Sequence, residues 1–361
     1  MKKITILFSL LLICSSALQA QKPNLEWKEA STLTLTGKLF PDTPNPYHRV
    51  DTVRFKGFTK VENSQIRNSS GIAVAFATDS PSIWVQSEYG EKGYQTGATG
   101  ICARGYDLYI RKDGKWLYAA SGVPSDEKLS LPYQLIRNLP EGRKECLMYL
   151  PNYSEEYSVK IGVPEGKTLE ALPNPFRHRI AVFGSSYTHG SCTGRSGMAY
   201  TSQFARMTGF EMLNLGVGGN SRLQSYFADA LAAADADAFL FDSFSNPYPK
   251  EIRERLFPFI EKIQAAHPGK PLIFQRTIRR ENRNFNTGSE RYESRRIEVA
   301  DSMMAIACKK YKDVYYIYPN ATSKYNDATI DGVHPSNYGY TLWMESILKP
   351  VKKILAKYNI K

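Results

Sequence analysis

The sequence predicts an α/β protein in two parts: an N-terminal β-sandwich of the jelly-roll kind, followed by a parallel sheet that helices cover on both faces. In the first half, short runs rich in β-branched and aromatic residues are separated by turn residues and show little helical periodicity. In the second half, short apolar runs alternate with longer segments of helical spacing, and the connections are long enough for crossovers between parallel strands.

Residues 1–20 have the organisation of a secretory signal peptide. Two lysines precede an apolar run (4–13) that is too short to span a bilayer comfortably, and small residues follow up to Ala20. We expect cleavage after Ala20 and an exported protein, periplasmic or extracellular, without membrane insertion. Cys14 raises the alternative of a lipid anchor, but the isoleucine before it is larger than a lipobox normally allows.

The chain is basic, with a formal net charge of +12 that includes the two lysines of the expected leader. A basic surface can attract nucleic acid, but export carries a protein away from most of it. We therefore expect no nucleic-acid partner, and anionic glycans or cell-surface polymers as the molecules that such a charge attracts. The sequence does not determine the oligomeric state.

Four cysteines lie beyond residue 20, and none has the Cys-x-x-Cys spacing of common zinc sites. We expect no metal and no other cofactor. An oxidising compartment permits disulfides, but four cysteines allow three pairings and the sequence does not select one. The four are Cys102, Cys146, Cys192 and Cys308.

The first half contains seven candidate strands. They lie over residues 50–58, 71–78, 82–89, 106–112, 115–120, 144–150 and 157–163. Asp113-Gly114, between two of them, predicts a tight hairpin. We assign the β-sandwich to residues 21–163. Residues 164–176 hold three prolines and little periodicity, which is typical of a linker.

The second domain is expected over residues 177–361. Its candidate strands are 180–183, 211–215, 238–244, 271–275 and 314–318, and its candidate helices are 197–208, 223–234, 250–266, 289–311 and 337–358. Small and polar residues follow the strands at the edge where a parallel sheet presents its carboxyl ends. Because ligands bind at this edge of open α/β sheets, we expect one site there.

The residues at this edge are those that an acyl-transfer reaction needs. The hydroxyl of Ser186 needs a base, here His334, and the base needs a carboxylate, here Asp331, to hold its tautomer. Ser186 and Gly219 offer backbone N–H groups, and Asn246 a side-chain amide, for an oxyanion hole. Each stretch alone also fits an ordinary turn. All of them in this order at one edge favour a site.

These residues resemble the four sequence blocks of the SGNH (GDSL-type) hydrolase superfamily. Residues 184–188 resemble the serine block, with Ser185 where the family usually has Asp. Residues 214–220 resemble the block that carries the oxyanion glycine, and residues 331–335 match the fourth block. The third block departs most, because Asn246 stands in Phe-Ser-Asn-Pro instead of Gly-x-Asn-Asp. The resemblance covers residues 177–358 and implies a flavodoxin-like three-layer α/β/α fold.

A narrower resemblance concerns residues 105–109, Gly-Tyr-Asp-Leu-Tyr, which are similar to the Gly-x-Asp-Leu-Tyr signature of a β-domain that precedes a subset of these hydrolases. Such proteins are often exported bacterial esterases that remove acetyl groups from carbohydrates. The resemblance implies a serine esterase for O-acyl, above all O-acetyl, groups of a saccharide. A small-molecule or polysaccharide ester is therefore the expected partner.

Candidates for substrate contact are Tyr187, beside the serine, and Arg276 and Arg279, which begin a basic segment after a strand. A solvated loop and helix face is the alternative for the two arginines. The glycine-rich segment 93–100 is either a flexible turn or a loop that reaches over the site of the second half.

Two other functions stay open at this level. One is a lipid or short-chain acyl hydrolase, although no long apolar lid is apparent. The other is a glycan-binding protein whose hydrolase domain is degenerate. Ser185 and the altered third block keep this alternative open, although the intact set of Ser186, His334 and Asp331 argues against it.

Overall fold

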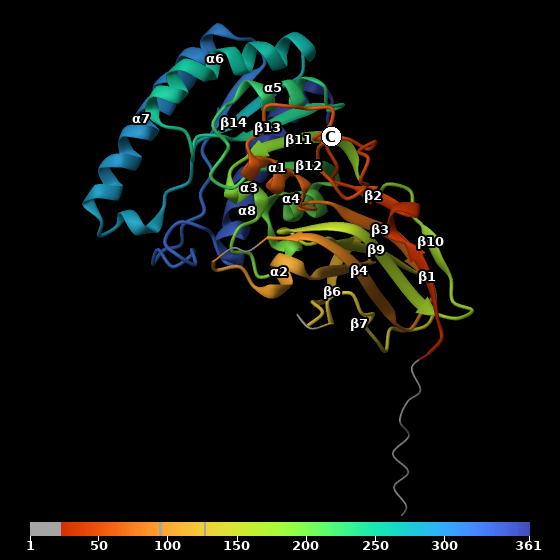
Figure 1. Ribbon diagram of the computed structural model, residues 1–361. Helices are drawn as coiled ribbons and strands as arrows, with labels where there is room; N and C mark the ends of the chain where they lie inside the picture. The colour runs from red at the N-terminus through yellow and green to blue at the C-terminus, as the bar shows by residue number, and fades with distance from the viewer. Residues whose placement is uncertain (1–22, 94–95, 126–127) are drawn as a thin grey trace, which may run out of the picture.

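The computed structural model describes residues 23–361 except 94–95 and 126–127. The expected signal peptide lies outside the described residues. Figure 1 shows antiparallel sheets built from the N-terminal part of the chain beside a parallel sheet with helices built from the C-terminal part. The predicted fold class is confirmed.

Two antiparallel sheets pack on each other in the N-terminal part. Their strand orders are β1-β9-β4-β7 and β10-β3-β8-β5-β6, with β2 paired to β3. Side chains such as Val74, Val85 and Ile161 fill the space between them. The strands are β1 (Leu25–Glu29), β2 (Thr34–Thr36), β3 (Ala73–Thr78), β4 (Ile83–Lys92), β5 (Tyr106–Lys112), β6 (Lys115–Gly122), β7 (Tyr133–Ile136), β8 (Lys144–Tyr149), β9 (Ser154–Pro164) and β10 (Leu169–Ala171).

Six of the seven strands expected in this part are present, and Asp113-Gly114 forms the β5–β6 hairpin with positive φ at both residues. The strand expected over 50–58 is wrong, because this segment forms turns. Val53 is exposed, and the other apolar residues pack outside the sheets. Val50 belongs to the core of the C-terminal part, and Phe58 packs on Phe227 with ring centroids 5.1 Å apart.

Two short helices in this part were not anticipated. They are α1 (Lys60–Arg67) and α2 (Gly100–Arg104). Helix α1 begins with a capping box, in which Glu62 accepts from the Thr59 backbone N–H (2.7 Å) and Thr59 Oγ1 accepts from the Glu62 N–H (3.3 Å). The Thr-x-x-Glu pattern is the signal in the sequence that points to this helix.

The C-terminal sheet is parallel, with strand order β12-β11-β13-β14-β15. The strands are β11 (Arg177–Gly184), β12 (Phe210–Gly216), β13 (Ala238–Asp242), β14 (Leu272–Gln275) and β15 (Val314–Ile317). This is the flavodoxin-like order: β12 lies on one side of β11, and β13, β14 and β15 follow on the other side. The crevice at that switch point lies beyond Gly184, the last residue of β11.

Helices cover both faces of this sheet. Apolar side chains of β11 point alternately to the two faces, so both faces need a cover. Ala181 and Phe183 pack under α5 (Ser225–Ala232), α6 (Pro249–Ala266) and α7 (Thr287–Lys310). Ile180 and Val182 pack under α4 (Tyr200–Thr208) and α8 (Asn337–Leu355). All the strands and helices expected in this part are present.

The two parts of the chain share their cores. Leu39, Phe40, Val50 and Ile66 join the cluster under α5 to α7, and side chains of β3 and β8 join the cluster under α4 and α8. The segment 164–176, expected to be a linker, contains β10, which pairs with β3. The boundaries of the two domains stay a prediction.

The motif at residues 105–109 connects the two parts. Gly105 has no room for a side chain, because a Cβ there would lie 2.5 Å from the Gly122 carbonyl oxygen. Asp107 is fully buried, and both of its carboxylate oxygens lie 2.8 Å from Arg195 Nη1. The Gly197 N–H also donates to Asp107, at 2.8 Å, and the hydroxyl of Tyr109 accepts from Arg195. The signature is therefore a docking element between the N-terminal sheets and the loop that carries Arg195 and Gly197.

We predict that Asp107→Asn lowers the free energy of unfolding by about 2–3 kcal/mol, because it leaves the partly buried Arg195 without its counter-charge. Thermal and chemical unfolding of the purified protein measure this. Asp113→Asn is the matched control, since Asp113 is exposed in a turn with φ of 50°, which asparagine accepts. An equal effect of both substitutions would contradict the docking role.

Candidate active site

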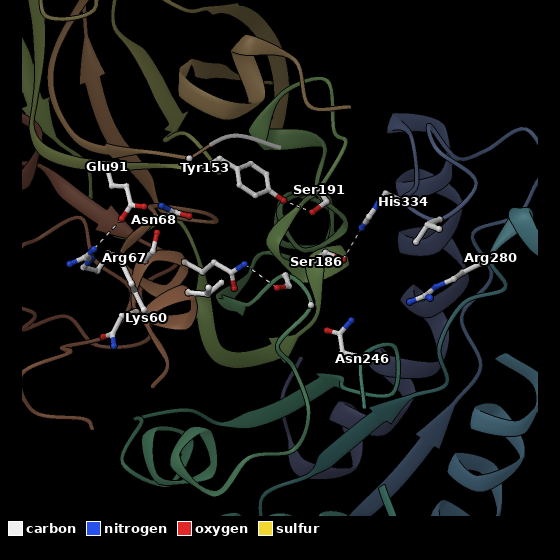
Figure 2. A pocket seen from close by; sticks show the side chains of 18 residues that line it. Lys60, Arg67, Asn68, Glu91, Tyr153, Ser186, Ser191, Asn246, Arg280 and His334 are labelled. Carbon is white, nitrogen blue, oxygen red and sulfur yellow. Dashed lines mark hydrogen bonds and ion pairs between the residues drawn. The ribbon is translucent and has the colours of Figure 1, made fainter. Parts of the chain in front are cut away.

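The nucleophile candidate stands directly after β11. Ser185 begins the short helix α3 (Ser186–His189), and its side chain accepts from the Tyr187 N–H at 3.2 Å. Gly184 before it must be glycine, because a Cβ would lie 2.0 Å from Thr188 Oγ1. This tight turn presents Ser186 Oγ to His334 Nε2 at 3.0 Å (Figure 2). The distance allows the imidazole to accept the hydroxyl proton.

The candidate base His334 and its candidate carboxylate Asp331 lie on one turn before α8. Asp331 Oδ2 lies 2.7 Å from His334 Nδ1, and Asp331 Oδ1 accepts from the backbone N–H groups of Val333 and His334 at 2.9 and 2.7 Å. Partial burial raises the pKa of the Asp331 carboxyl, but the hydrogen bonds from His334 and Val333 outweigh it, so the net pKa is below the usual value. The carboxylate stays ionised and fixes the Nδ1–H tautomer, which leaves Nε2 free to accept.

A second carboxylate, which the sequence reasoning missed, holds this turn in place. Glu281 accepts from the backbone N–H groups of Ala328 and Thr329 at 3.0 and 2.9 Å. The Asn282 N–H donates to the Gly332 carbonyl at 2.9 Å. Glu281 and Asn282 lie between β14 and α7, far from Asp331 in the sequence, so no local pattern indicates this support.

The three oxyanion candidates line one cavity with His334. Gly219 follows β12 and has φ of +74°, a conformation that favours glycine. Asn246 follows β13, and its Oδ1 accepts from the Ser221 N–H at 3.2 Å, which commits the oxygen and leaves Nδ2 as a donor. Figure 2 shows the Asn246 and Ser186 side chains on the same side of the cavity. The structure thus brings together Ser186, Gly219 and Asn246.

The N-terminal part also contacts the loop of residues 217–220, which carries the oxyanion candidate Gly219 and is called the oxyanion loop. Gln65 of α1 donates to the Gly218 carbonyl at 3.0 Å and accepts from Asn220 Nδ2 at 3.3 Å. Arg49 is fully buried and donates to the Gly216 carbonyl at 2.9 Å and to Asn214 Oδ1 at 3.2 Å. Burial lowers the pKa of Arg49 to about 9, so the guanidinium is still charged at neutral pH. No local sequence pattern indicates these contacts of Gln65 and Arg49.

A buried carboxylate lies under the nucleophile turn, where the sequence showed only Ser185. Asp242, the last residue of β13, accepts from Ser185 Oγ at 2.7 Å, from the Ser185 N–H at 3.1 Å and from Thr188 Oγ1 at 3.1 Å. Burial raises its pKa to about 6, although hydrogen bonds from Ser185, Thr188 and Ser245 oppose the shift. The neighbouring strand therefore supplies an acidic group next to the position where the family usually has Asp.

The cavity at the site has a volume of about 1100 Å³ and takes its walls from both parts of the chain (Figure 2). Helix α1 contributes a continuous face, because residues spaced three and four apart lie side by side on a helix. The lining residues are Lys60, Val61, Asn63, Ser64, Gln65, Arg67, Asn68, Glu91, Gly93, Tyr153, Ser186, Ser191, Gly218, Gly219, Asn246, Arg280, Val333 and His334. Most of them are polar.

The structure does not bring the three predicted substrate contacts into this lining. Tyr187 is fully buried, and its hydroxyl accepts from Arg280 Nε at 2.9 Å. Arg276 pairs with Asp301 at 2.9 Å, and Arg279 donates to Asn284 at 2.9 Å. Arg280 lines the cavity instead.

Arg280 also donates to the Ser245 carbonyl at 2.9 Å and pairs with Glu293 at 2.8 Å. It thus connects the turn of Ser186 to the turn of Asn246.

The glycine-rich segment 93–100 flanks the site. Gly93 lines the cavity, and a Cβ on Gly97 would lie 2.9 Å from Cys192 Sγ. The Thr96 carbonyl accepts from that thiol at 3.6 Å. Tyr94 and Gln95 lie outside the described residues. The described residues of this segment therefore lie beside the site, as expected for the second of the two alternatives, a loop that approaches it.

The four cysteines after the expected leader are free thiols, of which Cys308 is exposed and the others are buried. One group among the described residues could hold a metal ion: Cys192, Asp331 and His334. Over the same residues, no helix is long and apolar enough to cross a membrane.

Two family models match the chain. Residues 177–352 match the GDSL-like lipase/acylhydrolase family, and residues 25–169 match the N-terminus of SGNH-hydrolase-type esterases, named after its Gly-x-Asp-Leu-Tyr motif. No curated protein sequence matches significantly.

Solved structures resemble the whole chain. A protein described as a GDSL-like lipase from Bacteroides ovatus is 33% identical, with 92% of this chain and 98% of that one covered and a TM-score of 0.89. A salicylyl-acyltransferase from a tetracycline biosynthetic pathway is 18% identical (93% and 98% covered, TM-score 0.70). A family two carbohydrate esterase from Cellvibrio japonicus is 9% identical (92% and 98% covered, TM-score 0.59). The last two show a similar fold.

We predict that Asp242→Asn changes how stability depends on pH. In the native protein the carboxyl has a pKa of about 6, against an ordinary 3.8, so between these values the native state binds more protons than the unfolded state. The wild-type free energy of unfolding therefore loses about 3 kcal/mol from this group as pH rises from 4 to above 6. In Asp242→Asn the free energy of unfolding does not fall by this amount, because the amide does not titrate.

Unfolding of both proteins between pH 4 and 7 measures the difference. Ser185→Ala is the companion variant, because it removes one hydrogen bond to the carboxylate and shifts the same loss to higher pH. A constant difference between wild type and Asp242→Asn over this range would refute the assignment.

Proposed function

We propose that this chain, which belongs to the GDSL-like lipase/acylhydrolase family, hydrolyses O-acetyl esters of a carbohydrate outside the cytoplasm. As a member of that family it is a carboxylic ester hydrolase. The proposal adds the acyl group, the substrate class, the catalytic residues and export, with residues 1–20 removed as a signal peptide.

In the proposed mechanism Ser186 Oγ attacks the ester carbonyl and passes its proton to His334 Nε2. Asp331 stabilises the imidazolium that forms. The N–H groups of Ser186 and Gly219 and the amide of Asn246 stabilise the oxyanion. His334 then gives the proton to the leaving alkoxide, and an acetyl-enzyme remains. A water molecule, deprotonated by His334, releases acetate and restores Ser186.

The observation that carries the substrate class is that residues with polar side chains make up most of the lining of a large cavity. Lys60, Asn63, Ser64, Arg67 and Asn68 offer hydrogen-bonding groups over several ångströms beside Ser186. A saccharide, with a hydroxyl on most carbons, can use such a wall. A long acyl chain gains from apolar surface, and among the lining residues that the structure describes only Val61 and Val333 are aliphatic. This contrast favours a carbohydrate over a lipid.

Two further considerations support the proposal. The structural neighbours include family two carbohydrate esterases and an acetyl xylan esterase from Butyrivibrio proteoclasticus. The assembled contacts from Ser186 to His334 and from His334 to Asp331 also speak against a glycan-binding protein with a degenerate site, because a binding role does not need this geometry.

The test is acetate release from a panel of acetylated polysaccharides, together with aryl esters of increasing chain length. We expect release from at least one acetylated glycan and a fall in aryl-ester turnover beyond short acyl chains. Ser186→Ala should lower turnover by more than about 10³-fold. Unchanged activity in that variant would exclude the mechanism, and a preference for long acyl chains would exclude the substrate class.

The same panel separates glycan binding from chemistry. Lys60→Ala removes an exposed charge from the cavity wall, so we expect KM for the glycan to rise about threefold to tenfold, while turnover of a short aryl ester is retained. Lys56→Ala is the matched control, because Lys56 is exposed in the turn before α1 and does not line the cavity.

A further inference from the structure

We propose that Zn²⁺, or a divalent ion of similar thiophilicity, binds to Cys192, Asp331 and His334 and reversibly inhibits the esterase. The inference rests on the proposed function, because two of these ligands are the proposed base and its carboxylate. It adds a regulatory metal site, distinct from any cofactor of the reaction.

Three ligand atoms of suitable chemistry converge at this point. The Cys192 thiol, a carboxylate oxygen of Asp331 and a ring nitrogen of His334 all lie within 4.8 Å of one another. Sulfur, nitrogen and oxygen are the usual zinc ligands, with bonds of about 2.0–2.3 Å, so ligand atoms around a tetrahedral ion lie roughly 3.5 Å apart. Asp331 and His334, whose hydrogen-bonded atoms lie 2.7 Å apart, must therefore separate, and the thiol must move closer, each by roughly 1 Å. Water supplies the fourth ligand, as in open zinc sites.

The thiol has no evident role in the hydrolytic reaction. Cys192 is buried at 2% exposure, and its backbone has φ of +62°, a strained conformation for a residue with a side chain. Its Sγ donates a long hydrogen bond of 3.6 Å to the Thr96 carbonyl. The nearby Gly97 has no side chain that would fill the space beside the sulfur. Asp331 and His334 are partly exposed, so an ion can reach the site from their side.

Binding of an ion here stops the proposed chemistry for a definite reason. The resting imidazole carries its proton on Nδ1, which donates to Asp331. An ion bound to Asp331 and to Nδ1 replaces that hydrogen bond, and the imidazole proton moves to Nε2. Nε2–H then donates and no longer accepts the Ser186 proton. The thiol proton of Cys192 is released to solvent as the thiolate binds the metal.

The first experiment measures esterase activity of the mature chain with and without Zn²⁺, followed by addition of EDTA. We expect loss of activity that EDTA reverses. For each variant, the activity with Zn²⁺ is divided by the activity of the same variant without Zn²⁺, and these ratios are compared between variants. In Cys192→Ser the inhibiting concentration should rise by at least about tenfold, since loss of even an outer partner typically costs 10–100-fold in metal affinity. Cys308→Ser, at an exposed thiol, should respond like wild type.

The second experiment does not depend on activity. Cd²⁺ is added to Ser186→Ala, which keeps all three ligands, and the ultraviolet thiolate-to-cadmium charge-transfer band is recorded. We expect a stoichiometric band that is absent in Ser186→Ala/Cys192→Ser and present in Ser186→Ala/Cys308→Ser. No band in Ser186→Ala, or zinc inhibition that Cys192→Ser leaves unchanged, overturns the proposal. The band decides the matter even if the proposed ester substrate is wrong.

Discussion

The buried guanidinium of Arg49 connects the N-terminal part of the chain to the edge of the parallel sheet where the site lies. Its donors reach the carbonyls of Gln65 and Asn68 at the end of α1, and the Asn214 amide and the Gly216 carbonyl at the end of β12. These partners are carbonyl oxygens and not a carboxylate, so loss of the Arg49 side chain would leave several buried acceptors without their donor. Arg49 thereby fixes α1 against the oxyanion loop, and with it one wall of the cavity.

The site follows from this clamp together with the topology. The flavodoxin-like order directs the loops after β11, β12 and β13 to one edge, which brings Ser186, Gly219 and Asn246 together. The sheet alone leaves this edge open. Helix α1 closes one side of it and the turn of Asp331 the other, so the cavity for the substrate forms between parts of the chain that are far apart in sequence.

Local patterns in the sequence were enough for the parallel sheet and its helices, because a buried strand and an amphipathic helix each leave a periodic trace. The strand predicted over residues 50–58 is wrong because the apolar residues Val50 and Phe58 pack in the core around α5 and not within a sheet. The Asp331–His334 contact could be expected because it closes within one turn. The roles of Arg49, Gln65 and Glu281 could not, since each depends on a contact across the fold. Arg280, and not Arg276 or Arg279, reaches the cavity, and only the path of the loop after β14 decides between them.

Labelling with a fluorophosphonate that reacts with activated serines, followed by peptide mass spectrometry, tests the central claim most directly. The account predicts one stoichiometric adduct on Ser186, loss of esterase activity in step with labelling, and no adduct in His334→Ala. An adduct on another serine, or full esterase activity in the labelled protein, would contradict the claim that Ser186, activated by His334 and Asp331, is the nucleophile.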